Sequence, residues 1–359
     1  MTPMRLAVSL SRRALGLVSP NPPVGAVVAR EGEILGEGWT QPPGGPHAEI
    51  VALQQAGERA AGATLYTTLE PCNHHGRTPP CTEAIIEAGI AAVQAAARDP
   101  NPLVTGGGLA RLEKAGVRTV IGQDEGLARE VMEGYLKFAE TGTPFVTAKF
   151  AMSLDGKIAT RTGNSKWISG DRARRFAHEL RDRSDAVMVG VGTVLADDPQ
   201  LTSRNGRGLP LDRQPLRVIV DSQGKTPHDA RLLREPGLTL VAVASNDTPV
   251  GLSTTLERVE AEVVPAADGR IDLEEMMRLL GRREITSLLV EGGGTLLGSL
   301  FDLGLVDKVV AFVSPTIVGG VDALSPVGGK GFDRMADALR LDRVKWRRFG
   351  RDLAIIGYC

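Results

Sequence analysis

Two neighbouring stretches decide the fold of this chain: "PHAEIVALQQAG" at residues 46–57 and "TLEPCNHHGRTPPC" at residues 68–81. They contain His47, Cys72 and Cys81, an imidazole and two thiols, which are side chains that zinc prefers. A catalytic zinc site takes three protein ligands and keeps its fourth position for water, so this set predicts a catalytic site. Glu49 lies two residues after His47 on a predicted helix and therefore faces another side, where a carboxylate can move protons.

The surrounding sequence indicates where these residues lie. We expect a helix from about residue 48 to residue 56, capped by Gly57. Cys72 follows Pro71, a residue suited to the first turn of a helix, and Cys81 immediately precedes the helical stretch "TEAIIEAG". Helix amino termini favour the thiolate form that a metal binds. His-x-Glu opening one helix, then a strand, then Pro-Cys opening another helix is the pattern of zinc deaminases. Taken singly, "HAE" is a common tripeptide and cysteines are often buried apolar residues.

The spacing of the two cysteines departs from that pattern. Zinc deaminases usually have two residues between them, whereas eight residues, "NHHGRTPP", intervene here. Because this insertion begins at a ligand, we expect it to line the mouth of the pocket. It carries His74, His75 and Arg77, which suit a phosphate group. The alternative is that His74 or His75 is a rival metal ligand.

Length, charge and cysteine content limit the function. A chain of 359 residues exceeds the size at which one core usually keeps growing, which predicts two domains. Its 42 Lys+Arg residues balance 43 Asp+Glu residues and are dispersed, so small substrates are expected rather than nucleic acid. Of three cysteines the last is the terminal Cys359, which excludes a disulfide scaffold.

The amino-terminal stretch "MRLAVSLSRRALGLVSPNPP" contains twin arginines, but the apolar run after them is too short for a signal core. Leu6, Leu10, Ala14 and Leu17 fall at helical spacing and predict an amphipathic first helix. No stretch approaches the length needed to cross a bilayer. We therefore expect a cytoplasmic protein without a membrane partner.

The order of elements predicts two α/β domains, residues 1–143 and 144–359. "VGAVVAREGEILGEGW" reads as two strands joined at Glu31-Gly32, and strand-like and helix-like pieces alternate after it. The boundary falls at "TGTP", residues 141–144, where a helical pattern is interrupted. The second domain is richer in predicted strands, with a helix at about residues 171–183, and its exposed strand edges favour a homo-oligomer such as a dimer.

A glycine-rich turn stands out in the second domain. "SLLVEGGGTLLGSLF", at residues 287–301, predicts a strand, a turn and a helix, and backbone amides in such a turn can hold phosphate. Gly292, Gly294 and Leu297 do not satisfy the G-x-G-x-x-G pattern, so a Rossmann dinucleotide site is not supported. The alternative is that the glycines only permit close packing of helix on strand.

Taken together, these motifs resemble one family. "NPPVGAVV", "HAE" and "TLEPCNHHGRTPPC" resemble the bifunctional deaminase/reductases of riboflavin biosynthesis, and "AMSLDGKIA", "SKWIS", "VGTVLADDPQLTSR", "VIVDS" and "VEGGGTLLGSL" resemble their reductase half. The resemblance covers essentially the whole chain. It implies a cytidine-deaminase-like three-layer α/β/α domain followed by a dihydrofolate-reductase-like α/β domain. It also implies zinc, NADPH and a small phosphoribosyl pyrimidine as substrate, which is deaminated and then reduced in its ribosyl side chain.

The same resemblance implies roles for further residues. In the first domain Asn21 and Asn101 are expected to contact the pyrimidine, although Asn21 also suits a turn before proline. In the second domain the residues expected to contact the cofactor are Ala151, Trp167, Thr193, Asp197, Ser222, Gly293, Gly294, Thr295, Leu296, Leu297, Gly298 and Ser299. The residues expected to contact the substrate there are Ser165, Arg181, Leu201, Arg204 and Glu291.

Hydride delivery to the anomeric carbon of an opened ribosylamine requires a phosphate clamp and a proton source. Arg181 and Arg204 suit the clamp, and Lys149 suits the proton source, oriented by Asp197 or Glu291. The alternatives are an edge-strand solvent lysine for Lys149 and a helix-terminal charge for Arg181. Two other interpretations of the chain are a nucleoside or nucleic-acid deaminase with an accessory domain, and a binding module with structural zinc.

Overall fold

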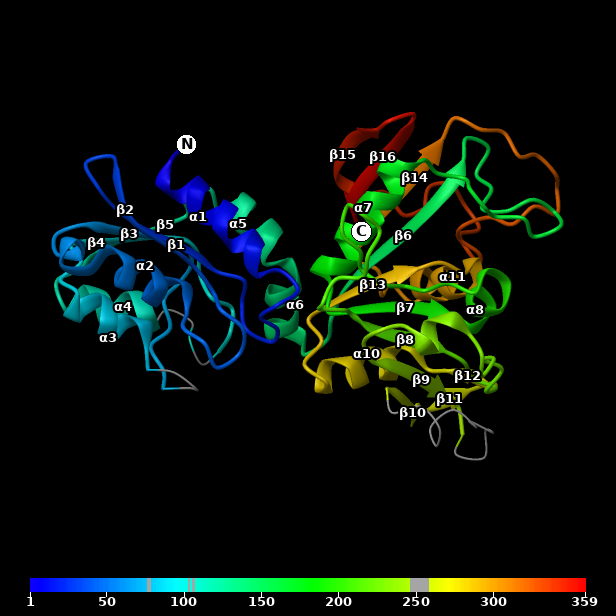
Figure 1. The fold of residues 1–359 in the computed structure, drawn as a ribbon, viewed down its shortest axis with the longest axis horizontal. Coiled ribbons are helices and arrows are strands. Elements are labelled where there is room, and N and C mark those ends of the chain that lie inside the picture. Colours follow the sequence, from blue (N-terminus) through cyan, green and yellow to red (C-terminus); the bar gives the residue numbers. More distant parts are fainter. Residues whose placement is uncertain (76–78, 103, 105–106, 246–257) are drawn as a thin grey trace. The chain divides into compact units, whose positions relative to one another are not determined.

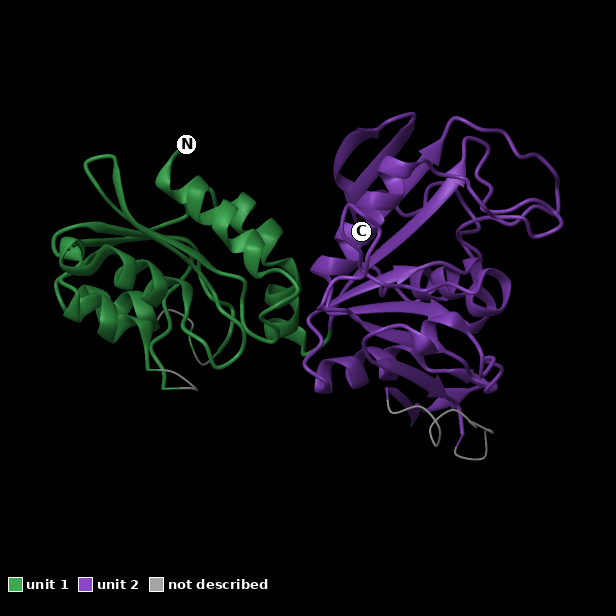
Figure 2. Cartoon of the chain, viewed as in Figure 1, with its two compact units in different colours: residues 1–143 green, residues 144–359 purple. Residues whose placement is uncertain are grey.

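The structure is a computed structural model that describes residues 1–75, 79–102, 104, 107–245 and 258–359. The chain forms two compact units, residues 1–143 and residues 144–359, coloured separately in Figure 2. Each unit has its own sheet and its own buried core.

The first unit is built on a five-stranded sheet in the order β2-β1-β3-β4-β5. Its strands are β1 (Gly25–Arg30), β2 (Glu33–Trp39), β3 (Thr64–Leu69), β4 (Ala92–Ala97) and β5 (Arg118–Ile121). β1 pairs antiparallel with β2 and β3, whereas β3, β4 and β5 are parallel. The hairpin between β1 and β2 turns at Glu31 and Gly32, both with positive φ, as the sequence predicts.

Helices cover both faces of this sheet, which confirms the three-layer α/β/α prediction (Figure 1). They are α1 (Pro3–Ser11), α2 (Ala48–Ala56), α3 (Cys81–Glu87), α4 (Gly107–Lys114), α5 (Glu125–Val131) and α6 (Glu133–Thr141). α2, α3 and α4 lie on one face, and α1 and α5 lie on the other (Figure 1). Glycine permits this close layering: a Cβ at Gly25 would lie 2.0 Å from the Ala7 carbonyl oxygen of α1, and a Cβ at Gly36 would lie 2.1 Å from the Ala52 carbonyl oxygen of α2.

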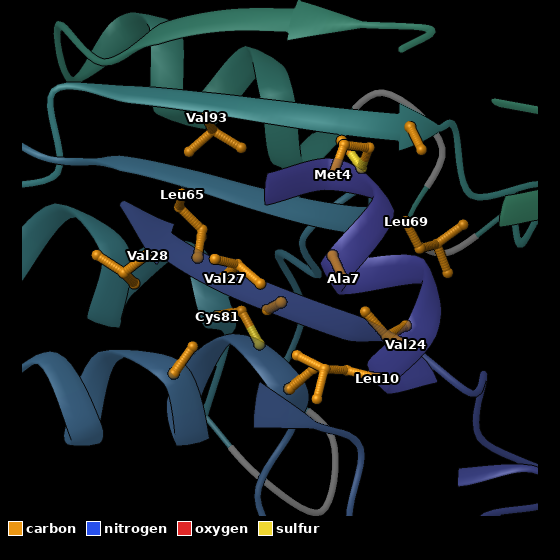
Figure 3. Packing of buried hydrophobic residues seen from close by; sticks show 14 of the residues in the cluster. Met4, Ala7, Leu10, Val24, Val27, Val28, Leu65, Leu69, Cys81 and Val93 are labelled. Carbon is orange, nitrogen blue, oxygen red and sulfur yellow. The ribbon is translucent and has the colours of Figure 1, made fainter. Parts of the chain in front are cut away.

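The core of the first unit joins α1 to the strands beneath it. Figure 3 shows side chains from α1, β1, β3 and β4 gathered in one cluster, with Cys81 among them. The predicted first helix exists but ends at Ser11 and continues as a short 3-10 turn to Ala14. Its buried face contains Met4 and Ala7, while Leu17, which we expected on that face, is exposed. The spacing therefore predicts the helix correctly but extends it too far.

The second unit has a nine-stranded sheet in the order β10-β9-β8-β7-β13-β6-β14-β16-β15. These strands are β6 (Phe145–Ser153), β7 (Ala186–Gly190), β8 (Leu216–Val220), β9 (Thr239–Val243), β10 (Val259–Val263), β13 (Ser287–Glu291), β14 (Lys308–Ser314), β15 (Asp342–Phe349) and β16 (Asp352–Tyr358). The strands from β10 to β14 are parallel, and β16 and β15 are added antiparallel. The pattern of residues 346–358, "WRRFGRDLAIIGY", predicts one strand, but these residues belong to a hairpin of two strands, β15 and β16.

Helices also cover both faces of the second sheet (Figure 1). They are α7 (Asp171–Arg183), α8 (Val191–Asp197), α9 (Arg231–Arg234), α10 (Leu273–Arg282) and α11 (Gly294–Asp302). A small hairpin, β11 (Ala266–Ala267) and β12 (Arg270–Ile271), stands apart from the large sheet. Successive residues of β7 alternate between two cores: Met188 belongs to the cluster with α10 and α11, and Val187 belongs to the cluster with α9. Among the described residues, no helix is both long and apolar enough to span a bilayer.

Candidate active sites

The structure brings His47, Cys72 and Cys81 together at one point of the first unit. Their ligand atoms all lie within 4.8 Å of one another. His47 Nδ1 is 3.6 Å from Cys72 Sγ and 3.3 Å from Cys81 Sγ. Ligands bound tetrahedrally at typical Zn–N and Zn–S lengths would be separated by about 3.5 Å. The donor types and the spacing therefore fit zinc, and Nδ1 is the imidazole nitrogen that faces the thiols.

Local structure holds each of the three donors. His47 is the amino-terminal cap of α2, and Cys81 is the first residue of α3. Cys72 does not open a helix, as its position after Pro71 had suggested; it lies in the irregular segment between β3 and α3, and its sulfur accepts the Cys81 backbone N–H at 3.3 Å. Thiolate stabilisation at Cys72 therefore comes from this backbone donor, while only Cys81 lies at a helix amino terminus.

A second helix presses on the segment that carries Cys72. A Cβ at Gly108, in the first turn of α4, would lie 1.9 Å from the Pro71 carbonyl oxygen, so only glycine allows this approach. The buried Glu70 carboxylate accepts the Leu109 backbone N–H at 3.2 Å and binds the same helix turn. Neither contact is evident from the sequence, because residues 70–71 and residues 108–109 are far apart in the chain.

The pKa values of the ionisable groups around the metal site are shifted far from their ordinary values. Hydrogen bonding to Cys81 lowers the pKa of the Cys72 thiol, and the contact with His47 lowers it further. Glu49 is buried, and burial raises the pKa of its carboxyl to about 7, although the charge of His47 acts in the opposite direction. A carboxyl with this pKa is matched to proton transfer near neutral pH.

The insertion between the cysteines folds beside the metal site. The Asn73 side chain accepts the Thr82 hydroxyl at 2.8 Å and fastens the insertion to α3. His74 is half-buried, and its Nδ1 has no hydrogen-bond partner among the described residues. His75 is exposed and lies 3.5 Å from Glu83. Arg77, predicted to contact the substrate, lies outside the described residues.

Two asparagines were predicted to contact the pyrimidine. Asn21 is half-buried in the irregular segment before β1, whose first residue, Gly25, donates its N–H to Thr68 at 3.1 Å. Asn101 follows β4, and its backbone N–H donates to the Asp99 carboxylate at 2.9 Å. The same carboxylate accepts the Tyr135 hydroxyl from α6. Sequence reasoning missed Asp99 and Tyr135, since no local pattern links residues so far apart.

A second cluster of charges lies in the second unit. Glu291, the last residue of β13, is the register partner of Lys149 on β6, and Lys149 Nζ lies 3.5 Å from Glu291 Oε2. Arg181 from α7 binds both oxygens of the same carboxylate, with Nη2 at 3.0 Å from Oε2. β6 is a central strand, so Lys149 is not the edge-strand solvent lysine of our alternative interpretation.

The two neighbouring cations determine the protonation state of Glu291. Burial alone would raise the pKa of Glu291, but the charges of Arg181 and Lys149 lower it to about 2. Glu291 is therefore ionised at neutral pH. Asp197 and Glu291 were the two residues predicted to orient Lys149, and Glu291 is the one that lies beside it.

The two predicted phosphate-binding arginines meet at Thr202. Arg181 Nη1 donates to the Thr202 carbonyl oxygen at 3.0 Å, and Arg204 Nε donates to the Thr202 hydroxyl at 2.9 Å. Leu201, the preceding residue, is buried with a positive φ. His178, which sequence reasoning missed, donates from Nδ1 to the same carbonyl oxygen at 2.9 Å. Much of the hydrogen-bonding capacity of Arg181 is thus already used inside the protein.

Asp197, at the end of α8, is hydrogen-bonded to the predicted Ser165 and to Lys166 beside it. Its carboxylate accepts the Ser165 hydroxyl at 2.7 Å, and its backbone oxygen accepts Lys166 Nζ at 2.9 Å. The neighbouring Trp167 ring is exposed and is stacked by the Arg174 guanidinium, 4.5 Å from its centroid. An exposed aromatic face of this kind can stack on a ring of a ligand.

The predicted cofactor residues lie at the carboxyl ends of neighbouring parallel strands, where α/β sheets bind ligands. Ala151 is on β6, Thr193 follows β7, Ser222 follows β8 and Gly293 follows β13. A Cβ at Gly293 would lie 3.1 Å from Thr193 Oγ1, so these two residues are in contact distance. Ser222 Oγ accepts the Ile271 backbone N–H at 3.1 Å.

The glycine-rich run at residues 293–299 contains both residues at the start of α11 and residues packed in the interior. Gly293 is the amino-terminal cap of α11, and Gly294 and Thr295 begin the helix. Leu296 and Leu297 are buried in the core, and a Cβ at Gly298 would lie 2.3 Å from the Gly328 carbonyl carbon. Gly298 therefore permits close packing of α11 on the irregular segment at Gly328, and not on a strand as our alternative interpretation supposed. Cofactor contact by the run, through to Ser299, stays a prediction.

Known proteins match both units. Residues 2–97 match the cytidine and deoxycytidylate deaminase zinc-binding region, and residues 144–355 match the RibD C-terminal domain. The riboflavin biosynthesis protein RibD of Aquifex aeolicus is 41% identical over 98% of this chain and 96% of its own length. RibD of Escherichia coli is 40% identical over 98% of this chain and 97% of its own length.

Solved structures match over the whole chain as well. RibD of Acinetobacter baumannii has a TM-score of 0.88 and 37% identity, covering 99% of this chain and 97% of its own. The diaminohydroxyphosphoribosylaminopyrimidine deaminase/5-amino-6-(5-phosphoribosylamino)uracil reductase of Thermotoga maritima has a TM-score of 0.88 and 36% identity, covering 99% and 98%.

A zinc-deaminase unit followed by an α/β reductase unit defines a bifunctional deaminase/reductase, and both predicted folds, cytidine-deaminase-like and dihydrofolate-reductase-like, are confirmed. The family follows from the full-length relatives. This chain belongs to the RibD family of riboflavin biosynthesis proteins.

Proposed function

We propose that this chain catalyses two consecutive reactions of riboflavin biosynthesis. Residues 1–143 hydrolytically deaminate diaminohydroxyphosphoribosylaminopyrimidine, and residues 144–359 reduce the ribosyl side chain of 5-amino-6-(5-phosphoribosylamino)uracil to ribityl with NADPH. The observation that carries the proposal is the convergence of His47, Cys72 and Cys81 beside the buried Glu49, in a chain whose second unit holds the Lys149–Glu291 pair. Family membership supports both activities.

In the deaminase unit, we assign His47, Cys72 and Cys81 as zinc ligands. Zinc bound there would supply a Lewis acid that lowers the pKa of a water molecule to about 7. Glu49 takes up a proton from that water and delivers it to the ring nitrogen. It then moves the second proton of the water, from the hydroxyl added to the ring carbon, to the amino group, which leaves as ammonia. Its burial keeps the carboxylate out of bulk solvent, where the shuttled proton would otherwise be lost.

Substrate binding in this unit is assigned to Asn21, His74, Arg77 and Asn101. The unpartnered Nδ1 of His74 supports its part, since a buried polar atom without a partner is costly and a ligand can satisfy it. Among the described residues, three side chains make up the one candidate cluster of metal ligands. A structural zinc site normally has four protein ligands, so this count favours a catalytic ion.

In the reductase unit, NADPH would supply a hydride to the anomeric carbon of the opened ribosylamine. We propose that Lys149 supplies or relays the accompanying proton and that the ionised Glu291 orients it. Arg204, with Arg181, binds the substrate phosphate, and Ser165, Leu201 and Glu291 form the rest of the substrate site.

The cofactor site in this proposal lies along the carboxyl ends of the parallel strands. The assigned residues are Ala151, Trp167, Thr193, Asp197, Ser222 and the run Gly293, Gly294, Thr295, Leu296, Leu297, Gly298 and Ser299. The contact between Thr193 and Gly293 supports a continuous surface across β7 and β13.

We further propose a cytoplasmic protein that acts on small molecules and not on nucleic acid, as the near-neutral charge indicates. β15, an edge strand with exposed side chains along nearly its whole length, supports a homo-oligomer.

A pair of variants tests the two halves separately. Glu49→Gln should abolish ammonia release from the diaminopyrimidine while zinc, measured by metal analysis, stays bound, and NADPH consumption with the deaminated uracil continues. Lys149→Met should abolish NADPH consumption with the deaminated uracil while ammonia release continues. Glu58→Gln, at an exposed glutamate of the first unit, serves as the control and should change neither activity. Deamination by the Glu49→Gln variant would exclude Glu49 from the reaction.

A further inference from the structure

A buried polar cluster outside the metal site joins the segment after β4 to α6 in the first unit. Asp99 follows β4, Tyr135 belongs to α6, and Asn101 lies between them in the segment after β4. Asp99 is 4% exposed and Tyr135 is 7% exposed. Burying a carboxylate and a phenol is costly unless both are hydrogen-bonded, so this cluster requires an explanation.

The hydrogen bonds of the cluster have a definite direction. The Tyr135 hydroxyl donates to Asp99, 2.9 Å from Oδ1 and 3.1 Å from Oδ2. Burial and the charge of Asp99 raise the pKa of Tyr135, so the phenol keeps its proton and remains a donor. The Asp99 carboxylate also accepts the Asn101 backbone N–H at 2.9 Å.

The Asn101 side chain also hydrogen-bonds to the Tyr135 hydroxyl. This contact lowers the pKa of Tyr135, as an N–H donor to the phenol oxygen does. Since the single Tyr135 hydrogen is used on Asp99, the hydroxyl accepts from Asn101, and the carboxamide therefore turns its nitrogen toward Tyr135. Both the backbone and the side-chain orientation of Asn101 thus depend on Asp99 and Tyr135.

The cluster lies next to the metal site. The charges of Glu70, at the end of β3, and of Cys72 both act on Asp99. The ends of β3 and β4 are neighbours in a parallel pair, and Leu69 is the register partner of Ala97. Asn101 therefore stands on the same edge of the sheet as the segment that carries Cys72.

From this geometry we propose that Asp99 and Tyr135 are positioning residues of the deaminase reaction, which act through Asn101 and not on the reacting atoms. The inference rests on the proposed function, in which Asn101 contacts the pyrimidine. Tyr135 fixes which end of the Asn101 carboxamide faces the substrate, and Asp99 fixes both Tyr135 and the backbone that carries Asn101.

The test compares Tyr135→Phe with a matched loss of a hydroxyl, Tyr66→Phe, on the half-buried Tyr66 of β3. Tyr135→Phe should raise the KM for the diaminopyrimidine about tenfold and leave kcat within about twofold, because one substrate hydrogen bond is weakened in ground and transition states alike. Tyr66→Phe should change neither. Asp99→Asn, which exchanges one acceptor for a donor, should raise KM as well.

A double-mutant cycle separates positioning from a general structural role. In an Asn101→Ala background, Tyr135→Phe should change KM less than about twofold, because the residue through which it acts is gone. Equal effects in both backgrounds, or a loss of kcat at constant KM, would overturn the inference.

Hydrogen exchange of the Asn101 backbone amide provides a readout that needs no substrate. Exchange should be faster in Tyr135→Phe than in Tyr66→Phe, since Asp99 loses the bond that holds its carboxylate in place. Equal rates would refute the positioning role. If the unmodified chain releases no ammonia, the proposed function fails, and the exchange measurement still decides the role of Tyr135.

Discussion

Replacing Glu291 by glutamine should destabilise the reductase unit by several kcal/mol at neutral pH. The carboxylate lies between Arg181 and Lys149, with its side chain only 8% exposed. Glutamine preserves the shape but leaves two buried cations without a counter-charge. Breaking a buried ion pair in this way typically costs about 3–5 kcal/mol.

The pKa of Glu291 gives an independent magnitude. It falls from an ordinary value of 4.5 to about 2 in the folded protein. At about 1.4 kcal/mol per pH unit, this difference corresponds to about 3 kcal/mol of stability. Because the folded-state pKa is depressed, the stabilisation is fully present above the unfolded pKa and is lost as pH falls from about 4.5 through about 2. The parent protein should therefore approach the Glu291→Gln variant in stability in acid.

Urea unfolding at pH 7 and at pH 3 measures both effects without adding screening ions. The gap in free energy of unfolding between parent and Glu291→Gln should be about 3–5 kcal/mol at pH 7 and smaller by about 2 kcal/mol at pH 3. Glu179→Gln on α7 is the control: its pair with Arg183 is exposed, so its loss should cost about 0.5 kcal/mol or less. A Glu291→Gln variant as stable as Glu179→Gln, or a gap that stays constant with pH, would refute the ion-cluster reasoning.

Two glycine substitutions should act at a distance from the chemistry. Gly108→Ala places a Cβ 1.9 Å from the Pro71 carbonyl oxygen, so the segment before Cys72 must move. A chelator-competition titration should then report zinc binding weakened about tenfold or more. The control, Gly126→Ala, has open space around its Cβ and should leave zinc binding unchanged. Gly298→Ala, whose Cβ would lie 2.3 Å from the carbonyl carbon of residue 328, should lower the unfolding free energy of the second unit by about 1–3 kcal/mol and weaken NADPH binding measured by fluorescence titration. Unchanged zinc binding in the first variant, or unchanged stability in the second, would contradict the packing that these contacts imply.

The sequence singles out His47, Cys72 and Cys81, which the structure brings together, because each stands in a recognisable local motif. His47 and Glu49 are two residues apart, so the face of the helix follows from their spacing alone. The fold of each unit also follows from local alternation of apolar and polar residues, with exceptions at ends and turns. The stretch at residues 342–358 contains a turn at Gly350, and this residue, with its positive φ, is the signal that divides one expected strand into two.

The parts that sequence reasoning missed depend on contacts between distant residues. Tyr135 meets Asp99 across 36 positions, and nothing in the neighbouring letters distinguishes it from an ordinary core tyrosine. Lys149 had an edge-strand interpretation because the strand order is not visible in the sequence. Cys72 was expected to open a helix, but it lies in an irregular segment, where its sulfur accepts the backbone N–H of Cys81, nine residues further along the chain.

The register of β6 against β13 has a consequence for how this family can vary in length. Lys149 and Glu291 face each other because their strands are aligned residue for residue. A strand repeats every second residue, so inserting or deleting a single residue just before Lys149 within β6 would turn its ammonium to the opposite side of the sheet. Surface loops generally tolerate changes in length, whereas a one-residue change within β6 before Lys149 would separate this ion pair.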